Sequence, residues 1–277
     1  MEHLVQRSID TMHHRFHEPL TLDDLARSAR VSKFYFLRVF SRVTGVTPGR
    51  FLSAVRLQEA KRLLRTTTLN VADISAQVGY SSTGTFSRRF SESVGVSPTK
   101  YRHMAGEWST GGPQQSADSA GGGASGAGAA VGASADVAPI TPIRALAPSE
   151  AHAIHGTIVA QDHPLTFAYL GLFSTPILQG HPAVTAVVRA PGRFRLPDLP
   201  PGVWYLHAVS RVSGDAPDAS PSSEPTLLVD MVGPLRLPQG SDFHVDLTLR
   251  PADWSHPPIL SALTGMDPFG CAPQHAA

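Results

Sequence analysis

The stretch SKFYFLRVFSRVTGVTP at residues 32–48 returns fifty residues later as STGTFSRRFSESVGVSP at residues 82–98. Five residues recur at the same places in both copies: Phe36 and Phe86, Arg38 and Arg88, Phe40 and Phe90, Gly45 and Gly95, Pro48 and Pro98. The two phenylalanines of each copy are four residues apart, so they lie on one face of a helix. A glycine then ends that helix and a proline begins another. The repeat predicts two closely similar amphipathic helices.

A shorter helical pattern precedes each copy, and a longer one joins them. Apolar or small residues recur at helical spacing in the short segments: Leu22, Leu25, Ala26 and Ala29 before the first copy, and Val71, Ile74, Ser75 and Val78 before the second. Thr21 and Asp24 have the spacing of a capping box, with aspartate in place of the usual glutamate or glutamine. Pro48 begins the longer helix, which we expect to reach about Arg65. Two short helices joined by a turn, twice over, indicate a duplicated helix-turn-helix.

The face of each repeated helix that points away from its apolar side is the candidate reading surface. It comprises Phe34, Leu37, Arg38 and Ser41 in the first copy, and Gly84, Ser87, Arg88 and Ser91 in the second. An exposed arginine on a rigid helix can make a bidentate contact with guanine in the major groove. Either arginine alone could equally be a solvated surface residue. Their recurrence at one site in both copies favours contact with DNA.

Charge is divided unevenly along the 277 residues, whose net charge is only +1. Residues 1–105 contain 16 lysines and arginines against 8 acidic residues, whereas residues 106–277 contain 7 against 14. A net of +8 beside a net of −7 predicts that the first part alone meets a polyanion. The single cysteine, Cys271, fits a reducing compartment. With no signal peptide or membrane-spanning stretch in the sequence, we expect a soluble cytoplasmic protein.

Residues 20–102, from LTLDDLARSARVSKFYFLRVF to VGYSSTGTFSRRFSESVGVSPTKYR, resemble the DNA-binding domain of AraC/XylS-type transcription regulators. The resemblance implies seven helices, with two helix-turn-helix units held by the long helix at about 48–65. The base-facing positions that it implies are Lys33, Phe34, Leu37, Arg38, Thr83, Gly84, Ser87 and Arg88. The phosphate-contacting positions that we assign are Arg42, Thr85, Lys100 and Arg102. Leu37 and Gly84 depart from the family pattern, so base reading falls to the arginines, to apolar contacts with thymine methyl groups and to DNA shape.

The resemblance implies a sequence-specific transcription regulator that reads two successive major-groove segments of double-stranded DNA. RNA polymerase and a small-molecule effector are further candidate partners, and we expect no membrane, no cofactor, no metal and no enzymatic activity. The sequence leaves open the operator, activation or repression, and the oligomeric state.

The chain changes character after residue 105. Residues 106–151 form a linker rich in Gly, Ala, Ser and Pro, which buries too little apolar surface to fold. We therefore expect two domains that tumble and unfold independently. The tether is also long enough for the acidic second domain to reach the basic recognition face and compete with DNA, and the alternative is that its negative charge only aids solubility.

Residues 152–250 consist of short alternating or β-branched runs separated by Gly and Pro turns, which predicts an all-β sandwich. Residues 251–277 are predicted to be an irregular tail. The stretch GRFRLPDLPPGVWYLHAV at 192–209, together with HGTIV at 155–159, resembles transthyretin-like modules related to carboxypeptidase regulatory domains. The expected fold class is therefore multi-domain: an all-α double helix-turn-helix, a flexible linker and a β-sandwich.

The role of the β-domain stays open at this point. Its histidines are scattered, and no carboxylate or cysteine joins them at metal-ligand spacing: His152, His155, His163, His181, His207, His244 and His256. An enzyme would also need a convergent polar pocket, for which the sequence has no signature. Two alternatives remain, a small-molecule sensor and an interaction or autoinhibitory module. A cavity lined by aromatic side chains with a few polar groups would favour the sensor, and a long exposed sheet edge or an apolar patch would favour association.

Overall fold

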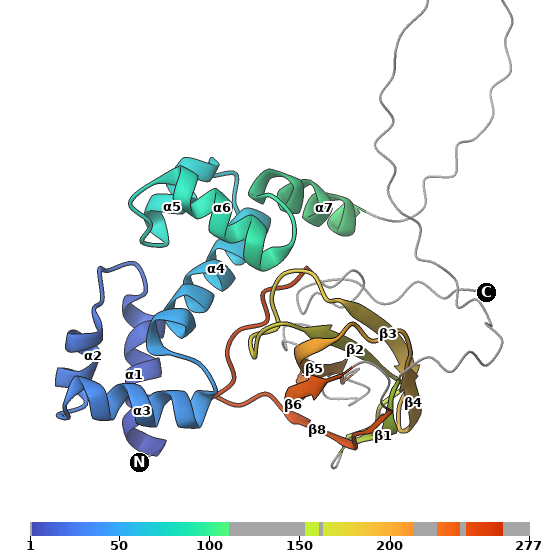
Figure 1. Ribbon diagram of the computed structural model, residues 1–277. Coiled ribbons are helices and arrows are strands. Elements are labelled where there is room, and N and C mark those ends of the chain that lie inside the picture. The colour runs from blue at the N-terminus through green and yellow to red at the C-terminus, as the bar shows by residue number, and fades with distance from the viewer. Residues whose placement is uncertain (1, 111–152, 161–162, 213–225, 239–241, 263–277) are drawn as a thin grey trace, which may run out of the picture.

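The computed structural model describes residues 2–110, 153–160, 163–212, 226–238 and 242–262. All regular secondary structure in the first of these segments is α-helix (Figure 1). Its helices are α1 (Glu2–Arg15), α2 (Leu22–Ser28), α3 (Lys33–Thr44), α4 (Pro48–Thr66), α5 (Val71–Gln77), α6 (Thr83–Val94) and α7 (Pro98–Thr110). The expected seven helices and the duplicated helix-turn-helix are thus confirmed. The linker expected at 106–151 overlaps the end of α7 and otherwise lies outside the described residues.

Local side-chain chemistry starts and ends these helices. Thr21 forms both hydrogen bonds of a capping box with Asp24. Aspartate thus takes the place of the usual glutamate or glutamine. Ser32 and Ser82 cap α3 and α6 by accepting a hydrogen bond from a backbone N–H three residues later. Both helices end at a left-handed glycine: Gly45 with φ of 73° and Gly95 with φ of 94°.

The two helix-turn-helix units share one core that is continuous along α4. In the first unit the rings of Phe36, Phe40 and Phe51 pack in sequence, with centroids 5.6 Å apart. In the second unit Phe86 and Phe90 pack in the same way against the ring of Tyr101 from α7. Each of these side chains is fully buried, and a buried aromatic of this size stabilises a small domain by several kcal/mol.

The second domain contains, among the described residues, eight strands in one strongly curved sheet. They are β1 (Ile154–Ala160), β2 (Phe167–Phe173), β3 (Val184–Arg189), β4 (Gly192–Leu196), β5 (Gly202–Arg211), β6 (Leu227–Leu237), β7 (Phe243–His244) and β8 (Leu247–Pro251). The strand order is β3-β2-β5-β6-β8-β1-β4, with β7 paired to β1. Most neighbours are antiparallel, but β1 runs parallel to β8 and to β7.

The sheet forms a nearly closed barrel, so the expected sandwich is wrong (Figure 1). The two ends of the strand order, β3 and β4, are consecutive in the chain and are joined only by residues 190–191. This short connection holds the two edges in contact, and the sheet curls upon itself instead of splitting into two layers. Its interior is filled by the inward residues of nearly every strand, among them Ile158, Leu170, Leu206 and Leu247.

The barrel packs directly against the helical domain. Ile177, after β2, and Leu260, after β8, are 2% and 1% exposed and belong to the same buried cluster as the phenylalanines of the helices. We call residues 252–262, which follow β8 and cross to the helices, the strap (Figure 1). The strap is irregular in secondary structure, as expected, but its end is buried at Leu260 and Ser261.

Three polar contacts fasten this junction. The N–H of Ala262 donates to the carbonyl of Val94 at 2.9 Å, and the N–H of Gly180 donates to that of Ser93 at 2.5 Å. Both acceptors lie at the end of α6, where helical carbonyls have no partner within the helix. Lys61 on α4 is fully buried and donates to the carbonyl of Ile259 at 3.3 Å. The two domains therefore form one packed body, contrary to the expectation that they tumble independently.

Candidate nucleic-acid interface

The outer face of α3 presents the residues expected to read bases in the first half-site. Lys33, Phe34 and Arg38 are exposed, and Leu37 is half-buried. Phe34 is the extreme case, because 78% of its surface is in contact with solvent. The ring therefore contributes nothing to the buried core of the helix and is available for contact with a partner.

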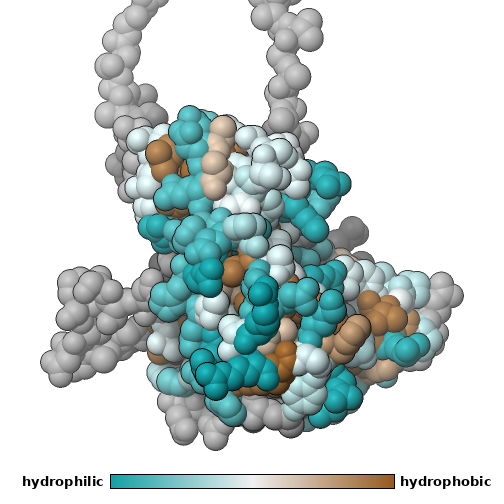
Figure 2. All heavy atoms as spheres, turned by 90° about the vertical axis from the view of Figure 1, so that its left-hand side faces the viewer, coloured by the Kyte–Doolittle hydropathy of each residue, from teal (hydrophilic) through white to brown (hydrophobic). Residues whose placement is uncertain are grey.

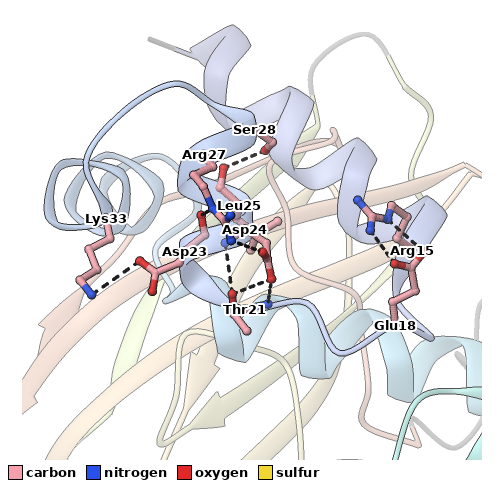
Figure 3. Close-up of polar contacts among 9 residues, drawn as sticks. All are labelled: Arg15, Glu18, Thr21, Asp23, Asp24, Leu25, Arg27, Ser28 and Lys33. Atoms are coloured by element: carbon pink, nitrogen blue, oxygen red, sulfur yellow. Dashed lines mark hydrogen bonds and ion pairs between the residues drawn. The ribbon is translucent and has the colours of Figure 1, made fainter.

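Neighbouring side chains orient the two cations of this face. The guanidinium carbon of Arg38 lies 5.7 Å from the ring centre of Tyr35, a cation–π contact. The Lys33 ammonium lies 3.6 Å from the carboxylate of Asp23, and Figure 3 shows it extended toward this residue from the start of α3. Both members of the pair are at least half exposed, so the pair is weak and a phosphate group can compete for the lysine.

Asp23 itself is held by the way α2 begins. Figure 3 shows the polar contacts around this turn: Thr21 with Asp24, and Asp24 with Arg27. The Thr21 hydroxyl and N–H both donate to the Asp24 carboxylate, at 2.6 and 3.0 Å, and hold the pKa of this group below its usual value. These contacts fix the start of α2, the helix that carries Asp23.

The outer face of α6 carries the second set of expected reading residues. Thr83, Gly84 and Arg88 are exposed, and Ser87 is half-buried. A side chain built at Gly84 would meet nothing within 4 Å, so this part of the helix is open and smooth. Apart from Arg88, the residues on this face have small side chains or none. The face of α3, in contrast, carries large side chains.

The expected phosphate contacts divide into two groups. Thr85 and Lys100 are exposed, and the backbone N–H groups of both donate to cap residues, Thr85 to Ser82 and Lys100 to Ser97. These N–H groups lie at helix N-termini, which suit phosphate binding. Arg102, in contrast, donates to the carbonyls of Leu64 and Leu69 and so ties α7 to the end of α4.

Arg42, the remaining expected phosphate contact, is exposed and lies where the helices meet the barrel. It lies in the last turn of α3, where it lines a cavity between the helices and the barrel. The sequence had no signal for this, because it did not reveal where the barrel would dock.

Arg56 is a positioning residue that the sequence analysis missed. Its guanidinium donates to the carbonyls of Phe16 and Glu18, both at 2.7 Å, and lies 5.9 Å from the ring centre of Tyr80. It thereby joins the end of α1, the middle of α4 and the turn of the second unit. The sequence did contain one signal for this role, because Arg56 is a charged residue among the apolar positions of the long helix.

Three further observations bear on the site. Within the described segments, no group of three or more His, Cys, Asp or Glu side chains could hold a metal ion. The described helices include none that is long and apolar enough to cross a membrane. The side of the helical domain that faces away from the barrel is mostly hydrophilic (Figure 2). His152 and Cys271 lie outside the described residues.

Comparison with known proteins agrees with this geometry. A family model described as a helix-turn-helix domain matches residues 25–104. The regulatory protein SoxS of Salmonella typhimurium is 35% identical over 102 residues, a match that spans 37% of this chain and 95% of SoxS. The lactose operon transcription activator of Staphylococcus xylosus is 29% identical over 99 residues, or 36% of each chain. The chain thus spans about a third of the length of the first curated relatives it matches.

Solved structures resemble the same part of the chain. The DNA-binding domain of AdpA, solved in complex with a target DNA, is 27% identical, with a TM-score of 0.37, covering 39% of this chain and 97% of that one. The family model ends at residue 104, before the barrel begins.

Proposed function

The chain belongs to the AraC family of helix-turn-helix proteins, and we propose that it is a transcription regulator that binds double-stranded DNA with α3 and α6 in two successive segments of the major groove. The observation that carries this proposal is the equivalence of Arg38 and Arg88. Both are exposed at the same position of helices that share one continuous core. A single chain can then read an asymmetric site without the symmetry of a dimer.

The two helices differ in what they can recognise. On α3, Arg38 suits a guanine, while Phe34 and Leu37 suit thymine methyl groups. On α6, Arg88 supplies the guanine contact, and Gly84 allows close approach without a side chain. The net charge of +8 over residues 1–105 supplies the part of the affinity that is independent of sequence and sensitive to salt.

Selection of binding sites from a random duplex library with the full chain tests this proposal. We expect two half-sites with centres about 10 base pairs apart, each containing a guanine. Arg38→Ala is expected to lose the base preference in one half-site and Arg88→Ala in the other, each with a loss of about 1–3 kcal/mol on the selected site.

Arg236→Ala is the matched control, since it removes an equal charge from an exposed position on β6 of the barrel. It should leave both preferences intact. A single enriched half-site, or the same loss of preference in both arginine variants, would contradict the proposal.

A second proposal concerns the barrel. The shared core around Ile177 and Leu260, and the contacts with α4 and α6, support a role as a brace that holds both units in one arrangement. The recognition residues remain exposed with the barrel docked, so the observations do not favour autoinhibition by covering that face. A small-molecule effector and contact with RNA polymerase remain predictions.

A further inference from the structure

A cavity of about 540 Å³ lies at the junction of the two domains. One wall is helical and includes Arg42 in the last turn of α3 and Gln58 on α4. The opposite wall is built by β5, β6 and the strap, to which Asp253 belongs. Any molecule that fills this space therefore contacts both domains at once. Its size is that of sites that enclose small organic molecules.

Part of the lining is apolar and rigid. Leu178 and Val209 are 5% and 1% exposed and belong to a small buried cluster, against which Ile259 of the strap packs. All three residues line the cavity. They offer a surface for an aromatic or aliphatic body of a ligand.

The lining contains both donors and acceptors, and its carboxylates outnumber its one guanidinium. The side-chain oxygen Oε1 of Gln58 is buried and has no hydrogen-bond partner among the described residues. A buried acceptor without a partner costs about 1–3 kcal/mol, which a donor from a ligand would recover. Asp230 and Asp253 lie on the same lining and add two carboxylates against the single guanidinium of Arg42.

His207, on the same lining, does not offset this negative charge. His207 is 6% exposed, and burial lowers its pKa to about 4, so its imidazole is neutral at pH 7. Its Nε2 lies 3.2 Å from the carbonyl of Thr175, and this contact fixes the ring. The Nδ1 of His256 lies 3.0 Å from the carboxylate of Asp253. The two carboxylates and the one guanidinium of the lining leave one negative charge, which a single ammonium group would balance.

We propose that this cavity binds a small organic ammonium compound. Its apolar body lies against Leu178, Val209 and Ile259, and its ammonium group donates to Oε1 of Gln58 and is balanced by the carboxylates. Because the ligand touches α3, α4 and the barrel together, its binding stabilises the docked arrangement of the two domains. Any effect of the ligand on DNA binding rests on the proposed function, whereas binding of the ligand to the cavity does not.

Calorimetric titration of the full chain with three indoles of matched shape tests the proposal. Tryptamine carries an ammonium group, 3-ethylindole is neutral and indole-3-propionate is an anion. We expect tryptamine to bind at least tenfold more tightly than either of the others. Equal affinity for the three, or no detectable heat with tryptamine, would overturn the proposal.

Substitutions at Gln58 locate the site. Gln58→Leu should weaken tryptamine binding at least tenfold, and Gln58→Glu should tighten it. Gln77→Leu, on the exposed surface of α5, is the control and should change nothing. If Gln58→Leu does not fold, Gln58→Glu decides alone, since an unchanged affinity there overturns the assignment.

The outcome is separable from that of the DNA proposal. Site selection from the duplex library is carried out without tryptamine, and the titration is carried out without DNA. If one of the two experiments contradicts its proposal, the other experiment still tests its own.

Discussion

Phe34 and Gly84 occupy equivalent positions on the two recognition helices, yet they are opposites in size. The ring of Phe34 is almost fully in solvent, whereas Gly84 leaves the same site on α6 bare. The neighbouring pairs differ too, since Lys33 corresponds to Thr83 and Leu37 to Ser87. The repeated fold therefore presents two chemically different surfaces, and the two half-sites of its DNA are expected to differ in sequence.

The first prediction is that Phe34→Ala weakens DNA binding without affecting stability. The ring is exposed, so its removal creates no cavity, and the unfolding midpoint should stay within about 1 °C of wild type. On DNA the variant loses apolar contact and should bind the selected site about tenfold more weakly. Val187→Ala, at another exposed apolar side chain on β3, is the control for both measurements. A lower midpoint with unchanged affinity would mean that the ring has a structural role.

The second prediction concerns acid stability through His207. Burial lowers its pKa to about 4, whereas the unfolded chain takes up the proton near pH 6.5. Between these values only the unfolded state binds the proton, so the free energy of unfolding falls as pH falls from 6.5 to 4. The linked loss is about 3 kcal/mol, and below pH 4 it grows no further.

Denaturant unfolding of wild type and of His207→Gln at several pH values measures this loss. Glutamine keeps a donor for the carbonyl of Thr175 but does not titrate. The difference between the two curves should decrease toward low pH, with carboxylate effects common to both. Parallel curves from pH 7 to pH 4 would show that the imidazole titrates normally.

At the scale of elements, the turn between the two helices of each unit needs a left-handed residue. Arg30 serves in the first unit with φ of 56°, and Gly79 serves in the second with φ of 83°. The two positions are 49 residues apart, as are the helices that precede them. A Cβ atom at Gly79 would also lie 2.8 Å from the carbonyl oxygen of His17. This distance is too short for an ordinary van der Waals contact.

We therefore predict that Gly79→Ala destabilises the protein by about 2 kcal/mol, because it combines left-handed strain with a backbone contact. Gly49→Ala is the matched control, since a side chain there meets nothing within 4 Å and the backbone is helical. It should leave stability unchanged or slightly higher. Thermal unfolding of the full chain measures both, and equal midpoints for the two variants would contradict the role given to this turn.

At the scale of the whole molecule, α4 and the barrel together link the two reading units. The strap and the loop after β2 cross from the barrel to the helices and bury Leu260 and Ile177 in the helical core. The buried Lys61 of α4 lies 5.6 Å from the ring centre of Tyr101 and also donates to the strap. The relative placement of α3 and α6 is thus supported from both sides of α4.

This arrangement predicts that the wild-type chain unfolds in a single calorimetric transition. Leu260→Asp places a charge in the shared core and should separate the domains, so that two transitions appear and the helical one comes first. Val203→Asp makes the same change at a half-exposed position on β5 and should preserve the single transition. Two transitions already in the wild type would mean that the junction contributes little to stability.

Local patterns in the sequence were sufficient for the helices and for most of the candidate interface. The i, i+4 phenylalanines, the serine caps and the stop glycines depend only on neighbours within a few turns, so they predict which face is buried. The positions of Phe34, Arg38 and Arg88 followed from the same periodicity, and that of Lys33 from the family resemblance. The exposure of these residues in the structure is what that periodicity requires.

Contacts between distant segments were decided only by the tertiary structure. The alternation of the strands is the same in a sandwich and in a barrel, and the pairing order that closes the barrel depends on residues far apart in the chain. The docking of Ile177 and Leu260 on the helices, and with it the cavity beside Arg42 and Gln58, depends on two surfaces that meet only after both domains have folded. The sequence by itself determined a duplicated helix-turn-helix because its signals are local, whereas the body that holds this unit arises from burial between surfaces that no local pattern encodes.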